Sequence, residues 1–144
     1  MTLNLVKLIP PFLLCFSLTL SSQEKFSPEK ISDAALELTK KKVVYDGSYY
    51  NIPYPNGDVP FGIGVCTDVV IRAYRANGVD LQKEIHEDMS ANFNLYPNIW
   101  GLKKPDKNID HRRVPNLMTY FERQGSKIPI TSNGRDYRPG DVVA

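Results

Sequence analysis

Apolar residues recur at helical spacing in four stretches of the chain, and signals for helix starts or ends flank these stretches. Ser27, Pro28 and Glu29 supply an N-cap, a proline at the first helical position and an acid in the first turn. Asn77 with Gly78, and Gly125, follow two later stretches as stop signals. The pattern predicts helices over residues 28–42, 66–76, 81–93 and 114–124.

The segments between the helices have a different composition. Residues 45–64 are rich in tyrosine, proline and glycine, which disfavours helix and strand alike and predicts a long loop, and long loops inside compact domains usually carry function. Strand signal appears only at 127–130 and 141–144, so the expected class is α+β.

Apolar stripes on two of the predicted helices indicate which faces are buried. The expected buried stripes are Val69, Val70, Ala73 and Tyr74 in one helix and Leu117, Met118, Tyr120 and Phe121 in another.

The first residues have the pattern of a secretory signal peptide. A positive charge at Lys7 precedes a mostly apolar run over residues 8–20, and small residues follow at a plausible cleavage site. The run is short for a membrane span of about 20 residues. We therefore expect residues 1–21 to be removed, which leaves residues 22–144 as one exported domain, periplasmic or secreted, with no stable membrane anchor. Lipid attachment at Cys15 is the alternative, although large leucines precede that cysteine.

Charge excludes some partners. The formal net charge of +2 falls to +1 when Lys7 leaves with the signal peptide, and no basic run remains that would indicate a nucleic-acid partner. The rest of the chain is long enough for one compact domain.

Cys66 is the candidate nucleophile. Gly62 and Gly64 run into it and a helical pattern runs out of it, so the thiol is expected at a helix N-terminus, where the macrodipole and free N–H groups favour thiolate. A lone cysteine is more often a small buried hydrophobic residue. Here the glycines allow a substrate backbone to approach, and an unpaired thiol is a liability in an oxidising compartment, so we expect a catalytic role.

The residues next to Cys66 have two interpretations. Thr67 and Asp68 occupy the first helical turn, where they would satisfy free N–H groups and complement the dipole. Asp68 is also a candidate for orienting a base or a substrate amide. His86 lies among acidic residues in the middle of a predicted helix and is expected to be a solvated surface residue.

A cationic cluster precedes the last predicted helix. His111, Arg112 and Arg113 stand where positive charge is unfavourable unless an anion answers it. One interpretation is that the carboxylates of Asp106 and Asp110 supply this negative charge in a structural ion-pair cluster. The functional alternative is a carboxylate-binding edge of the active site, with Arg112 and Arg113 as ligands and His111 as the base. A metal site would need ligands from elsewhere, so we expect no metal and no cofactor.

Several motifs together carry a family resemblance. They are Gly64-Val65-Cys66-Thr67-Asp68-Val69-Val70, Tyr96-Pro97, the run from Asn108 to Leu117, and Arg138-Pro139-Gly140-Asp141-Val142-Val143. Across nearly the whole mature chain they resemble an exported bacterial family, domain of unknown function 1287. That family more distantly resembles the papain-like cell-wall cysteine hydrolases of the NlpC type, in which a cysteine opens a helix packed on an antiparallel sheet.

The resemblance implies an amidase or peptidase that acts on peptidoglycan peptides, with Cys66 as nucleophile. The NlpC-type hydrolases have a tyrosine upstream of the cysteine. It corresponds to Tyr45 or Tyr54 of this chain, which makes both candidates for substrate binding. In those families a later strand bears the base histidine, and this chain stops at Ala144, so we expect an incomplete sheet and a missing base unless His111 replaces it. The rival is a non-catalytic periplasmic module that binds glycan or peptide through its tyrosine-rich loop.

Overall fold

The computed structural model describes residues 27–144, so the expected signal peptide and Cys15 lie outside the described residues. The described part consists of helices, one small sheet and single 3-10 turns. The helices are α1 (Pro28–Thr39), α2 (Cys66–Ala76), α3 (Leu81–Asn92) and α4 (Val114–Arg123). The strands are β1 (Val44–Tyr45) and β2 (Ile63–Gly64), and the 3-10 turns are η1 (Phe93–Leu95), η2 (Asp110–Arg112) and η3 (Gly134–Asp136).

Local signals set the helix boundaries close to those expected. The Ser27 hydroxyl accepts the Lys30 N–H at 3.4 Å, which confirms the predicted N-cap. The Asp80 carboxylate caps α3 in the same way by accepting the Gln82 N–H at 3.0 Å. The first helix ends at Thr39, three residues before the expected end, where Lys40, Lys41 and Lys42 follow.

The apolar core lies between α2, α3 and α4. Ile71, Leu81 and Ile85 are almost completely buried there, with Met89, Tyr96, Leu117 and Tyr120 around them. The two predicted stripes are partly wrong, because Val69 and Met118 are exposed and Ile71 takes the central position on α2. Burial of this α2 face excludes Val69, which lies on the opposite side of the helix.

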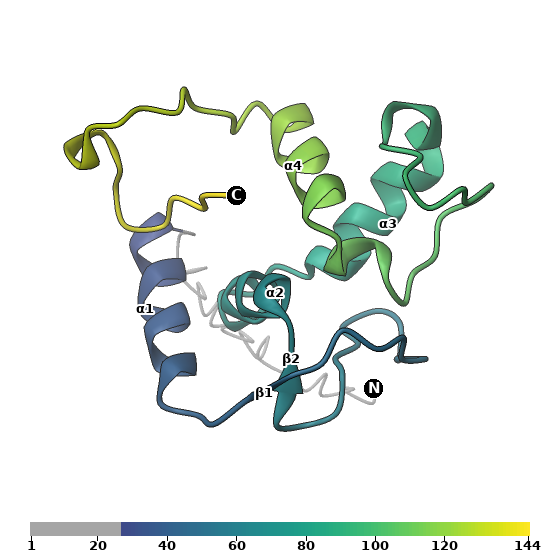
Figure 1. Cartoon of the computed structure of the whole chain (residues 1–144), viewed down its shortest axis with the longest axis horizontal. Coiled ribbons are helices and arrows are strands. Elements are labelled where there is room, and N and C mark those ends of the chain that lie inside the picture. Colours follow the sequence, from purple (N-terminus) through teal and green to yellow (C-terminus); the bar gives the residue numbers. More distant parts are fainter. Residues whose placement is uncertain (1–26) are drawn as a thin grey trace, which may run out of the picture.

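Helix α2 occupies the middle of the molecule (Figure 1). Helix α1 packs on one side of it, and α3 and α4 lie on the other. After α4, residues 126–144 run as an extended segment over to the beginning of α1 and then turn back toward the centre. Gly140 makes that contact possible, since a Cβ there would lie 2.4 Å from the Pro28 carbonyl oxygen and the residue has a φ of +97°.

The sheet differs from the one expected. Strands β1 and β2 pair in parallel, with Val44 opposite Ile63 and Tyr45 opposite Gly64, and so close the long loop that was predicted to be structureless. Residues 127–130 and 141–144 are extended but join no sheet, so the prediction of strands there is wrong. Within residues 27–144 no strand lies beside them to complete a ladder. The chain is α+β, and the antiparallel sheet is absent from the described residues.

In the part of the chain that the structure describes, no helix combines the length and apolar character needed to cross a bilayer.

Candidate functional site

Cys66 is the first residue of α2, and its side chain is exposed. It lines two pockets, one on each side of the start of α2. We name them the apolar pocket, of about 500 Å³, and the basic pocket, of about 850 Å³. A thiol between two cavities of this size is accessible to a ligand that occupies either one or bridges both.

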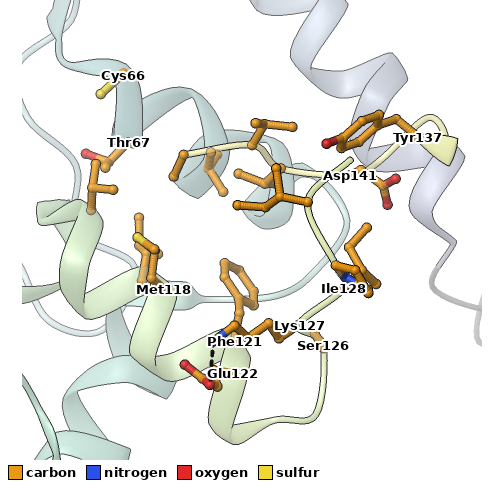
Figure 2. A pocket seen from close by; sticks show the side chains of 18 residues that line it. Cys66, Thr67, Met118, Phe121, Glu122, Ser126, Lys127, Ile128, Tyr137 and Asp141 are labelled. Carbon is orange, nitrogen blue, oxygen red and sulfur yellow. Dashed lines mark hydrogen bonds and ion pairs between the residues drawn. The ribbon is translucent and has the colours of Figure 1, made fainter. Parts of the chain in front are cut away.

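The apolar pocket lies between α2, α4 and the extended C-terminal segment. Figure 2 shows Cys66 at one end of it and Tyr137 at the other, with Met118 and Phe121 along the α4 wall. Its few charged groups include Glu122 and Lys127, whose ion pair of 2.7 Å is drawn in the same view. The exposed Met118 is thus part of a cavity wall rather than of the core.

The basic pocket lies between the end of α1, the β1–β2 pair and the other face of α2. Val69 and Tyr45 line it, so the exposure of both side chains has a structural reason. Four cationic side chains, Lys41, Lys42, Arg72 and Arg75, and one carboxylate, Asp58, are also in its wall.

A buried ion pair holds the start of α2. The Arg112 Nε and Nη2 atoms donate to the two carboxylate oxygens of Asp68 at 2.9 and 3.0 Å, with only 6% of Arg112 and 3% of Asp68 exposed. The same Asp68 carboxylate accepts the Val65 N–H at 2.6 Å. The Thr67 hydroxyl donates to the Arg112 carbonyl at 2.9 Å. Thr67 and Asp68, in the first turn of α2, are therefore both hydrogen-bonded to Arg112 of η2.

Arg112 also reaches the long loop. Its guanidinium donates to the Ser48 carbonyl at 3.2 Å and to the Asp46 carbonyl at 3.3 Å. Hydrogen bonds from Ser48 and Tyr50 lower the pKa of the Asp46 carboxyl to about 2. The guanidinium therefore joins three segments that are far apart in sequence, and it does not face either pocket of Cys66.

The backbone at the start of α2 has free donors. The N–H groups of Cys66 and Thr67 make no hydrogen bond within the described residues, as expected for the first positions of a helix. Such donors beside a nucleophile can stabilise an oxyanion that forms on an attacked carbonyl.

His111 is buried in the interior. It is 2% exposed and lines neither pocket of Cys66. Burial, reinforced by the charges of Arg112 and Arg75, lowers the pKa of His111 to about 4, so the imidazole is neutral at pH 7. The residue lies near the charges of Asp68 and Arg112, and no hydrogen bond joins it to the Cys66 thiol.

The two candidate tyrosines lie in different parts of the structure. Tyr45 shares the basic pocket with Cys66 and is 76% exposed. Tyr54 instead packs edge-on against His86, with ring centroids 5.2 Å apart, and lines neither pocket. His86 is only partly exposed, and its buried Nδ1 atom has no partner in the described residues, so the expectation of a solvated surface residue holds only in part. The ring contact with Tyr54 is the physical reason.

Arg113 belongs to a separate ion-pair cluster. Its Nη1 donates to the Asp110 carboxylate at 3.3 Å, and its guanidinium lies 4.0 Å from the centroid of the Trp100 ring. The Asp110 carboxylate also accepts the Asp106 N–H. Burial raises the pKa of Asp110. Arg113 thus has its counter-charge within the same short segment. Within residues 27–144 no three His, Cys, Asp or Glu side chains are grouped closely enough to hold a metal ion.

The site contains residues that the sequence interpretation missed. Arg72 and Arg75 line the pocket of Cys66 from one face of α2, because positions i and i+3 of a helix lie side by side. Lys41 and Lys42 reach the same pocket from the end of α1. The spacing of the arginines and the lysine run after α1 were visible in the sequence, but nothing there indicated that these two segments meet.

We predict that Arg112→Gln destabilises the fold by about 3 kcal/mol or more, because it leaves the Asp68 carboxylate buried without its cation. Arg113→Gln is the matched control, with an expected cost of about 1 kcal/mol, since that side chain is less buried and its partner Asp110 keeps the Asp106 N–H as a donor. Urea unfolding of both variants measures the difference. Equal losses would contradict the central position of Arg112.

We predict that stability falls as the pH is lowered from about 6.5 to about 4, because in this range the unfolded chain binds a proton at His111 that the folded chain does not. The loss between pH 7 and pH 5 should be about 2 kcal/mol. Urea unfolding against pH measures it, and His111→Gln should flatten the profile. An unchanged slope in His111→Gln would contradict the burial of a neutral imidazole.

The comparisons with known proteins agree with the family expected from the motifs. The family model described as Domain of unknown function (DUF1287) matches residues 32–144. The chain is also 53% identical over 114 residues to the "Uncharacterized protein YijF" of Escherichia coli (strain K12), which covers 79% of this chain and 56% of YijF. The chain thus spans little more than half the length of that relative. No solved structure shows a significant match. The chain belongs to the bacterial family of domain of unknown function 1287.

Proposed function

We propose that this protein is an exported cysteine amidase or peptidase of papain-like ancestry that acts on peptide amides, peptidoglycan peptides being the substrate implied by the NlpC resemblance. The observation that carries the proposal is the position of Cys66, which is exposed at the first residue of α2 between two pockets. A structural cysteine is usually buried, whereas a nucleophile must be reached by substrate.

The chemistry follows from the groups around the thiol. The Cys66 thiolate attacks the carbonyl carbon of a bound amide, and the free N–H groups of Cys66 and Thr67 supply the donors for the resulting oxyanion. Expulsion of the amine gives a thioester on Cys66, which water hydrolyses. The buried Asp68–Arg112 pair positions the helix start without contacting the reacting atoms.

The proton donor for the leaving amine is not assigned to a described residue. His111 and His86 line neither pocket of Cys66. Because this chain spans 56% of YijF, the activity of the whole protein is best assayed on both proteins in parallel.

A second candidate function is a binding module for periplasmic glycan or peptide. The observation that favours it is the exposed aromatic surface at the basic pocket, where Tyr45 is 76% and Phe61 is 93% exposed. Exposed aromatic rings grip sugars and peptides with little loss of side-chain entropy. In that case the Cys66 thiol has no role in ligand binding.

We predict that Cys66→Ala abolishes hydrolysis of peptides released from peptidoglycan, because it removes the thiol that lines both pockets and forms the thioester. Ser90→Ala, which changes an exposed side chain outside both pockets, is the control and should leave the rate unchanged. Chromatography of the peptide products measures hydrolysis, and mass spectrometry of acid-quenched samples detects the thioester on Cys66.

The two candidate functions give different outcomes. Peptide binding by equilibrium dialysis without turnover by either this chain or YijF, and without any effect of Cys66→Ala on the affinity, would replace the hydrolase with the binding module. Turnover that survives Cys66→Ala would contradict the role of the thiol.

A further inference from the structure

The two pockets that meet at Cys66 differ in charge. The apolar pocket contains Lys127 with the carboxylates of Glu122 and Asp141, and the rest of its lining is mostly apolar. The basic pocket contains four cationic side chains and one carboxylate. A ligand that bridges the pockets across the thiol therefore passes from apolar surroundings into a positive field.

The carboxylate in the basic pocket does not neutralise all of its cations. Asp58 accepts hydrogen bonds from Arg72 at 2.9 and 3.0 Å and from Arg75 at 2.9 Å. Burial alone would raise the pKa of Asp58, but the hydrogen bond and charge of Arg72 and the charge of Arg75 lower it, so this group stays ionised. One negative charge is thus shared by two guanidinium groups.

Lys41 and Lys42 add to this excess. Both side chains are exposed, and neither forms an ion pair with any described residue. They follow the end of α1 and line the pocket opposite the arginines of α2. Cations that converge on one cavity from two elements, with a shortage of counter-charge, are the arrangement that recognises an anionic ligand group.

We propose that the basic pocket is a subsite for a carboxylate of the substrate, so that the amide presented to Cys66 carries an acidic residue on the side of the basic pocket and an apolar residue on the other side. The scissile amide in this statement rests on the proposed function. The carboxylate subsite itself does not, because its charges are present whether or not Cys66 cleaves a bond. The site differs from Arg112 and Arg113, whose guanidinium groups are engaged by Asp68 and Asp110.

The subsite can be tested without any turnover. Cys66 is alkylated with iodoacetate, which is anionic, and with iodoacetamide, which is neutral and of nearly equal size, and mass spectrometry of the Cys66 peptide gives both rates. A positive pocket concentrates the anionic reagent, so Lys41→Glu/Lys42→Glu should lower the iodoacetate-to-iodoacetamide ratio about threefold at low ionic strength. Lys103→Glu/Lys104→Glu makes the same change of net charge outside both pockets and should leave the ratio unchanged.

A second measurement identifies the ligand class. Acetylated and amidated Ala-Glu-Ala should protect Cys66 from iodoacetamide at lower concentration than the neutral Ala-Gln-Ala, and Lys41→Gln/Lys42→Gln should remove that difference. Inorganic phosphate that protects as well as the acidic peptide would overturn the choice of a carboxylate. Equal ratios in the two charge-reversed proteins, each checked for an unchanged melting temperature, would overturn the subsite. Selective protection without hydrolysis would uphold the subsite while contradicting the amidase.

Discussion

The buried ion pair between Asp68 and Arg112 is the constraint on which the rest of this structure depends. One carboxylate accepts two guanidinium donors and the Val65 N–H, and one guanidinium holds two loop carbonyls. Removing two charges from water costs several kcal/mol each, and only near-complete hydrogen bonding compensates for that cost. The pair is therefore formed correctly only when α2, η2 and the loop after β1 are all in their native places.

That constraint places the reactive group by an indirect route. Asp68 and Thr67 are both hydrogen-bonded to Arg112, which fixes the orientation of the first turn of α2. Cys66 is therefore exposed where the two pockets meet. The Asp68–Arg112 pair that fixes the helix start is buried, while the exposed Cys66 side chain lines both pockets. The ion pair and the thiol thus use different residues for stability and for ligand contact.

Helices were the part of the fold that the sequence could predict, because capping residues and stop signals act within a few positions of where they stand. The expected α2 starts and ends at Cys66 and Ala76 as observed. Exposure of Val69 and pairing of β1 with β2 depend on contacts between distant segments, and no local pattern reports those. The same reason explains the site: the candidacy of Cys66 follows from local signals, whereas Arg112 turns out to answer Asp68, 44 positions away. The neighbouring Asp106 and Asp110, which the sequence offered as counter-charges, serve Arg113 and the local backbone instead.

The most direct test of this account is a double-mutant cycle on Asp68 and Arg112, read as the free energy of unfolding in urea. Asp68→Ala, Arg112→Ala and the double variant separate the interaction between the two side chains from their separate packing. If the pair organises the helix start, each single variant is strongly destabilised, the double variant is little worse than either, and the coupling free energy is at least about 2 kcal/mol. Additive losses, with a coupling below about 0.5 kcal/mol, would contradict the account.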